Sequence, residues 1–309
     1  MEPPFVETEL WNVEAYVCSW RFAVVQDDTW MGLGDGIAIT GKRRPSQIFA
    51  LPFERIDDPV GSTLLLQKYW YHSMTISFVY FVTVKLLQRF MRHREPFQLN
   101  RPLFLWNASL AIFSIIGFIR SVEDTIYSLY YLGLFPSMCY TIHPYGVAAF
   151  WALLFAISKI IELGDTYFIV LRKRPLTFLH CYHHIVVIIG AAYGGASHAA
   201  HGRFFVTMNY FVHGIMYAYY ACASYGLHPS RFIAMFVTTL QIVQMLGGIT
   251  VNYLVHQIKL HETAPCQQSM GNIYVGYLIY GSFALLFIKF YINAYFLRPK
   301  QRFKQKKIE

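Results

Sequence analysis

Seven long apolar stretches constrain the fold of this chain more than any other feature of its sequence. Each is close to the ~20 residues that an α-helix needs to cross a bilayer. Only 14% of the 309 residues are charged, whereas soluble domains carry about 25%. The sequence therefore predicts an all-α polytopic membrane protein, a single bundle of seven transmembrane helices. The stretches cover roughly residues 70–90, 103–122, 146–170, 180–199, 204–224, 232–256 and 273–297.

Basic residues predict the orientation of this bundle. The loops after the first, third and fifth stretches contain most of the loop arginines and lysines, among them the contiguous group Arg172, Lys173 and Arg174. The alternate loops hold only Arg203 and Lys259. Because cytosolic loops are enriched in basic residues, we expect a cytosolic C-terminus and, with an odd number of spans, a luminal N-terminus.

The charge distribution also narrows the class of partner. The net charge of +9 arises from a few clusters beside the expected spans. This pattern suits contact with membrane lipid headgroups or with the phosphates of a ligand. No surface module that combines basic and aromatic residues is visible, so we expect no nucleic-acid partner.

Three regions follow from these patterns. Residues 1–65 are punctuated by proline and glycine, contain neither an apolar run nor a signal peptide, and are expected to be irregular. Residues 66–298 hold the membrane domain, and residues 299–309 form a basic cytosolic tail. The tail ends in KKIE, which resembles a dilysine signal for retrieval to the endoplasmic reticulum.

Two cysteines are candidates for a disulfide. Cys139 and Cys266 fall in two loops that the predicted topology places on the same luminal side. An oxidising lumen favours their pairing. The alternative is a pair of free loop thiols.

Polar side chains gather in the third to sixth stretches, where an ionisable group predicts a functional site. Within each stretch most of them recur at spacings of three or four residues, so they share a helical face. At 1.5 Å per residue they lie in the cytosolic half of the bilayer, from ~5 Å deep at His183 to ~16 Å at His213. The set is Lys159, Glu162, Asp165, Thr166, His180, His183, His184, Asn209, His213, Tyr217, Gln241 and Gln244.

We expect Lys159, Glu162 and Thr166 to share one face of a continuous helix, with Asp165 beside it. Hydrogen bonding between helices is the alternative for any one of these groups, and capping of a helix start is the alternative for His180. A common depth indicates instead a pocket that opens toward the cytosol.

Three uses of the histidine triplet in HCYHH stay open on this reasoning alone. HxxHH is one histidine box of membrane di-iron desaturases and hydroxylases, but those enzymes use several boxes and this chain has one, so we expect no metal. A seven-span receptor or transporter fits the topology, yet neither a DRY-like nor an NPxxY-like motif is present. The third use is catalysis without metal, because imidazole is both a nucleophile and a proton carrier near neutral pH.

Four blocks carry a family resemblance. KIIELGDT, HCYHH, MNYFVHGIMYAYY and TTLQIVQM resemble, in order and spacing, the KxxExxDT, HxxHH, NxxxHxxMYxYY and TxxQxxQ blocks of the very-long-chain fatty acid elongases, the ELO family. The resemblance covers about residues 70–300 and is closest to the branch that elongates saturated and monounsaturated acyl chains. It implies a condensing enzyme of the endoplasmic reticulum membrane that joins acyl-CoA to malonyl-CoA, releases CO2 and CoA, and yields 3-oxoacyl-CoA.

The resemblance also implies roles for individual residues. His183 would take the acyl group as an acyl-imidazole or act as general base, with His180 and His184 orienting it and holding protons. Glu162 and Asp165 would fix the ring tautomers. His213 and Asn209 would face the thioester carbonyl or the enolate, and Gln241 and Gln244 would supply further hydrogen bonds. The phosphates of CoA would be bound by Arg172, Lys173 and Arg174.

The expected cofactors and partners complete this hypothesis. The substrates are acyl-CoA and malonyl-CoA, and we expect no cofactor, because the sequence has no Gly-rich strand–helix turn for a nicotinamide. The reductase and dehydratase steps of the cycle would then need partner enzymes, and a homodimer is expected by analogy.

Overall fold

A computed structural model describes residues 21–24, 29–34, 37–42, 50–54, 56–142, 146–261 and 266–297. From Pro52 onward, the regular elements in these ranges are helices, which confirms the predicted helical bundle for this part of the chain. The predicted tail at 299–309, with its KKIE end, lies outside the described residues.

The expectation of an irregular segment over residues 1–65 does not hold for its described strands. The strands β1 (Arg21–Val24), β2 (Thr29–Gly34) and β3 (Ile37–Lys42) form an antiparallel sheet in the order β1-β2-β3. Strand β3 reads IAITGK, which is rich in β-branched residues, and an Asp-Gly pair, a hairpin signal, separates it from β2. The sequence analysis missed both signals because the strands are short.

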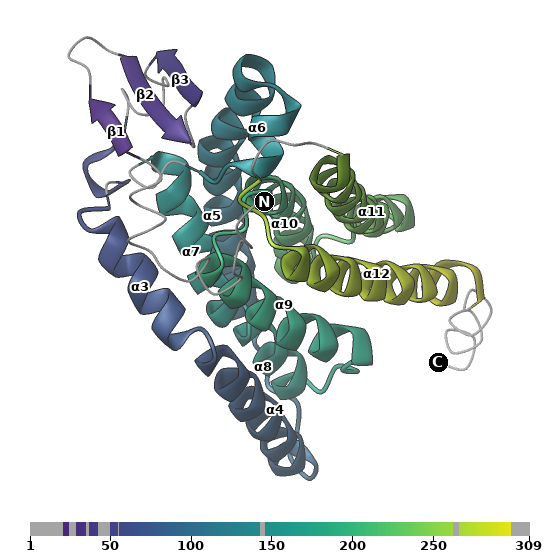
Figure 1. Ribbon diagram of the computed structural model, residues 1–309. Coiled ribbons are helices and arrows are strands. Elements are labelled where there is room, and N and C mark those ends of the chain that lie inside the picture. Colours follow the sequence, from purple (N-terminus) through teal and green to yellow (C-terminus); the bar gives the residue numbers. More distant parts are fainter. Residues whose placement is uncertain are drawn as a thin grey trace.

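Each expected span overlaps one helix or one pair of helices (Figure 1). A further helix, α3 (Pro59–Tyr69), begins inside the segment that was expected to be irregular. Short pieces are η2 (Pro52–Glu54), η3 (Ser128–Leu132), α6 (Leu134–Cys139) and η4 (Asn293–Leu297). The long helices are α4 (His72–Met91), α5 (Asn100–Tyr127), α7 (Val147–Ile161), α8 (Gly164–Leu171), α9 (Phe178–Ala196), α10 (Gly202–Tyr225), α11 (Arg231–His261) and α12 (Met270–Ile292).

Four helical segments of the described chain are long and apolar enough to cross a membrane. They are Asn100–Leu132, Val147–Leu171, Arg231–His261 and Met270–Leu297. Helix α9 carries three histidines and α10 several polar residues, and such side chains lower the mean hydropathy of a helix. The protein is therefore a multi-pass membrane protein, while the count of seven spans and the orientation of the termini stay predictions.

Helix α9 has a central place among the helices around the candidate site. It packs against α3, α4, α7 and α12 (Figure 1). Helices α5 and α10 pair closely, since a Cβ at Gly117 would lie 2.6 Å from the ring of Tyr210. A disulfide between Cys139 and Cys266 joins the end of α6 to the segment before α12.

Candidate active site

The third expected span is interrupted inside its polar motif. Helix α7 ends at Ile161 and α8 begins at Gly164. Across this break the backbone N–H of Asp165 donates to the carbonyl of Glu162, and that of Thr166 donates to Leu163, at 3.1 and 3.2 Å. These bonds to the third preceding residue are those of a 3₁₀ turn, which is tighter than an α-helix.

The tightened turn changes which residues share a face. A 3₁₀ turn places residues three apart in line, so Asp165 aligns with Glu162, and Thr166 points elsewhere. The predicted face of Lys159, Glu162 and Thr166 is therefore wrong in its last member. Three contacts with α10 instead form a ladder: Lys159 Nζ to Asn209 Oδ1 at 2.8 Å, Glu162 Oε2 to His213 Nδ1 at 3.6 Å, and Tyr217 OH to Asp165 Oδ2 at 2.8 Å.

The first two steps of the ladder form a buried, charge-balanced cluster. Lys159 donates to Glu162 Oε1 at 2.7 Å, and Ser158 donates to the same oxygen at 3.1 Å. Lys159 and Glu162 are 2% and 4% exposed. Such a pair is tolerated in a low-dielectric interior only when its remaining hydrogen-bonding groups are also satisfied. Here Asn209 accepts from the lysine, and His213 lies against the carboxylate.

Asp165 connects three helices through hydrogen bonds. Among the described residues, no contact joins it to the histidine triplet. Its two carboxylate oxygens accept from Trp106 Nε1 at 2.7 Å and from Tyr217 OH at 2.8 Å. The expected role in fixing a ring tautomer therefore has no contact to support it. The sequence analysis missed Trp106, although an indole N–H inside a predicted span needs an acceptor.

Two of the three histidines belong to a second polar chain that connects α9 to α8 and α4. His180 Nε2 lies 2.9 Å from Thr166 Oγ1, which lies 2.8 Å from the hydroxyl of Tyr80. The rings of His180 and His184 are 4.4 Å apart. The alternative of His180 as a helix cap is wrong, because the side chain of Thr177 caps α9 by accepting from the His180 N–H.

His183 faces a cavity. Its ring packs against Phe283, with 5.0 Å between centroids, and lies next to His184, with 5.6 Å between centroids. The cavity has a volume of about 360 Å³ and is lined by residues from α3, α7, α9, α10, α11 and α12. His183 therefore joins the second polar chain to a space that could hold a ligand.

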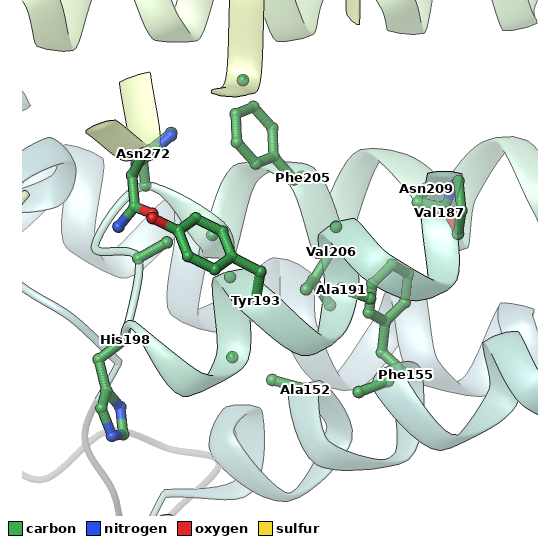
Figure 2. A pocket seen from close by; sticks show the side chains of 18 of the residues that line it. Ala152, Phe155, Val187, Ala191, Tyr193, His198, Phe205, Val206, Asn209 and Asn272 are labelled. Atoms are coloured by element: carbon green, nitrogen blue, oxygen red, sulfur yellow. The ribbon is translucent and has the colours of Figure 1, made fainter. Parts of the chain in front are cut away.

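The wall of the cavity changes in character along its length (Figure 2). Asn209 and Val187 border one end, and Tyr193, His198 and Asn272 border the other. Between them the wall is apolar and combines small side chains with the rings of Phe155 and Phe205, as expected for a space that holds an aliphatic chain. The intermediate residues include Ala152, Ala191 and Val206.

The two glutamines of α11 differ in position. Gln244 is buried and borders the cavity. Gln241 donates to the sulfur of Met216 at 3.1 Å and is not among the residues found along the cavity wall. The structure thus brings one of these two predicted residues to the cavity.

The predicted basic loop lies at the end of α8. Arg172 donates to Asn100 Oδ1 at 3.0 Å, and Lys173 lies 3.4 Å from the carbonyl of Arg92. Lys173 and Arg174 are exposed. Among the residues that the structure describes, no three His, Cys, Asp or Glu side chains are grouped as metal ligands.

Comparison with known proteins identifies the family to which this chain belongs. Residues 65–304 match the family described as "ELO: GNS1/SUR4 family". The chain is 48% identical over 261 residues to putative fatty acid elongase 4 of Caenorhabditis elegans, covering 84% of this chain and 90% of that protein. It is 41% identical over 237 residues to very long chain fatty acid elongase 6 of Rattus norvegicus, with 76% and 89% covered. It is 39% identical over 239 residues to very long chain fatty acid elongase 3 of Mus musculus, with 76% and 86% covered.

Proposed function

Because the chain belongs to the ELO family of fatty acid elongases, we propose that this membrane enzyme catalyses the condensing step of elongation. It joins a long-chain acyl-CoA to malonyl-CoA, releases CO2 and CoA, and forms 3-oxoacyl-CoA. Neither the di-iron enzyme nor the receptor considered from the sequence agrees with the names of these relatives.

One observation carries the proposal: His183 and Asn209 belong to the polar site and also border the apolar cavity. An acyl chain in the cavity would bring its thioester carbonyl to these two side chains. Condensation needs this combination, because the aliphatic chain requires an apolar space and the carbonyl requires a nucleophile and a hydrogen-bond donor.

His183 is the proposed nucleophile. A ring nitrogen attacks the thioester carbon, the C–S bond breaks, and CoA leaves with the proton that the ring gives up. Malonyl-CoA then loses CO2, and the resulting enolate carbon attacks the acyl carbon; the C–N bond to the ring breaks, the ring nitrogen takes up a proton, and 3-oxoacyl-CoA is released. In the alternative route His183 acts as general base and the acyl group passes directly to the enolate.

Asn209 is the proposed donor to the developing negative charge. Its carbonyl oxygen already accepts from Lys159, which leaves the N–H groups of the amide as the part that is free to face the cavity. A fixed donor aimed at an oxyanion is among the larger contributions to catalysis. Lys159 then acts by holding the amide in this orientation. Gln244 borders the cavity, and we propose that it and His213 add further hydrogen bonds around the substrate.

His180 and His184 are proposed to move protons behind His183. The His184 ring lies next to those of His183 and His180, and His180 hydrogen-bonds to Thr166, which hydrogen-bonds to Tyr80. This chain of groups leads away from the cavity, so a proton can be exchanged without water entering the apolar space.

The remaining assignments extend the same proposal. Arg172, Lys173 and Arg174 would bind the phosphates of CoA, no cofactor would be needed, and the endoplasmic reticulum would be the location. A separate reductase and dehydratase would complete each cycle, and the chain would assemble as a homodimer. The basic loop supports the assignment of CoA phosphates, and the fatty acid elongases among the relatives support a place in an elongation cycle.

A microsomal condensation assay tests the proposal. Labelled malonyl-CoA and a panel of acyl-CoAs are supplied to wild type, to His183→Ala and to His228→Ala, a control at an exposed loop histidine. We expect 3-oxoacyl-CoA from wild type and the control and none from His183→Ala. Mass spectrometry of the protein after acyl-CoA alone distinguishes the two routes, since only the nucleophile retains the acyl group. Condensation by a folded His183→Ala protein would overturn the assigned role, and no product from wild type would overturn the function.

A further inference from the structure

We infer that the segment ahead of the first expected span, residues 50–54 and 56–66, closes the cavity and sets the length of the acyl chain, with Glu54 as the positioning residue that holds it. This inference rests on the proposed function. Ile56, Ser62, Thr63 and Leu66 all border the cavity. All but Leu66 precede the region that matches the family, residues 65–304, so most of this wall is supplied by the chain's own N-terminal part.

Helix α3 is fitted against the second half of α9. Leu66 packs so closely on Gly195 that a Cβ there would lie 2.7 Å from Leu66 Cδ2. Gln67 donates to the carbonyl of Ala196 at 3.1 Å. The ring of Trp70 meets Tyr193 edge to face, with 5.4 Å between centroids. These contacts make α3 a fixed wall.

The wall stands at the end of the cavity that is remote from the reacting group. Gly195 follows His183 by twelve residues on the same helix, which corresponds to ~18 Å along its axis. A thioester at His183 would therefore direct the methyl end of the acyl chain toward Leu66. A side chain in this position limits length, because an extra methylene has no space beyond it.

Glu54 anchors the start of this wall. Its carboxylate accepts from Arg120 through both Nε, at 2.8 Å, and Nη2, and from Trp151 Nε1 at 2.8 Å. It also accepts from the backbone N–H of Leu51 at 2.9 Å. Glu54 is 1% exposed, and a buried carboxylate with this many donors holds its position strongly. Because Ile56 follows two residues later, the same contacts place the first residue of the wall.

The anchor and the cavity share one helix. Trp151 precedes Ala152, which borders the cavity from α7. Loss of the Glu54 contacts would therefore loosen the segment beside the cavity while the polar site around His183 stays in place. The effect expected from such a change is on chain length and not on the chemical step.

The test compares the preferred acyl length of variants on adjacent residues. Leu66→Ala enlarges the cavity, and Leu66→Phe shortens it. Leu65→Ala is the control, because it removes the same atoms from a neighbouring side chain that is 61% exposed. Full-length proteins are assayed in microsomes with labelled malonyl-CoA and saturated acyl-CoAs that differ by two carbons. One methylene in an apolar pocket changes discrimination by about 10- to 200-fold, so Leu66→Ala should favour the next longer acyl-CoA at least tenfold over wild type.

The other variants should shift the preferred acyl length in the opposite direction, leave it unchanged or broaden it. Leu66→Phe should favour shorter acyl-CoAs, and Leu65→Ala should keep the wild-type profile. Glu54→Ala should broaden the range of accepted lengths while turnover of the shortest acyl-CoA persists, and the conservative Glu54→Gln should broaden it less.

The possible failures are distinguishable. If wild type condenses acyl-CoAs and both Leu66 variants keep its length profile, the inference is wrong and the proposed function stands. If wild type forms no product, the proposed function itself is wrong. If the Leu66 variants fail to accumulate, Ile56→Ala takes their place, and an unchanged length profile in that variant refutes the inference.

Discussion

Removal of the Lys159 charge should separate stability from catalysis in this protein. In Lys159→Met the Glu162 carboxylate stays buried without its main partner, which costs about 3–5 kcal/mol for a broken buried pair. For a chain of this size, at ~2 °C per kcal/mol, the melting temperature should fall by roughly 6–10 °C. His213, 3.6 Å from Glu162, can offset part of this by taking a proton, so the lower end of the range is expected.

The double variant Lys159→Met with Glu162→Leu should regain most of that stability, because a buried ion pair replaced by apolar groups of similar volume is often neutral. It should not regain condensing activity, since Asn209 has lost the lysine that orients its amide. Melting temperature in detergent and product formation in microsomes are measured for all variants, with Lys68→Met as an exposed control. A single variant as stable as wild type, or a double variant with wild-type turnover, would refute this reasoning.

Two other elements can be examined by stability alone. Cys139→Ser with Cys266→Ser opens a link across 127 residues, so the melting temperature should fall, by a loss of up to about 5 kcal/mol from loop entropy; an unchanged melting temperature would contradict this. Burial raises the pKa of Glu54, but hydrogen bonds from Arg120 and Trp151 outweigh it and hold the pKa below its ordinary 4.5. Because the pKa of Glu54 is lower in the folded than in the unfolded protein, its contribution to stability is complete at pH values above the pKa of the unfolded state. That contribution is lost as the pH falls through the pKa of the folded state. Wild type should therefore lose more stability than Glu54→Gln below about pH 4, with a constant difference from pH 5 to 7; parallel curves would argue against it.

Apolar length and periodicity were sufficient to predict the helices that overlap the expected spans, but not α3. A run of about twenty apolar residues has few alternatives to a membrane helix, so each expected span overlaps the observed helices. The sheet at Arg21–Lys42 was missed because strands of four to six residues leave only a weak pattern.

The members of the site were easier to predict than their partners. Spacing placed Lys159 and Glu162 together because both lie on one helix. The same spacing could not predict Trp106 or Tyr80, which contact Asp165 and Thr166 from other helices. Contacts between helices depend on packing that spacing within one helix does not describe. The sequence predicted that a pocket exists but not which residues line it, because its wall combines residues from six helices.

The interruption of the third span has a geometric reason in its ladder with α10. The ladder advances three residues at a time from Lys159 to Asp165 and four at a time from Asn209 to Tyr217. Four residues of an α-helix rise ~6 Å, and three rise only ~4.5 Å. Three residues of a 3₁₀ turn rise ~6 Å. The tightened turn between Glu162 and Asp165 therefore rises by the same distance as the four residues from His213 to Tyr217, so that the Asp165 carboxylate meets its partner.

Insertion of two alanines between Leu163 and Gly164 tests this explanation. With two added residues a regular α-helix turns ~500° from Glu162 to Asp165, so Asp165 points ~140° away from Tyr217 and Trp106. We expect condensing activity to be lost and the melting temperature to fall, since the carboxylate then stays in the helix bundle without either donor. The same insertion after Leu227, in the exposed loop between α10 and α11, should leave both quantities near wild type. Full activity with the two alanines after Leu163 would mean that the register between the third span and α10 does not matter for the reaction.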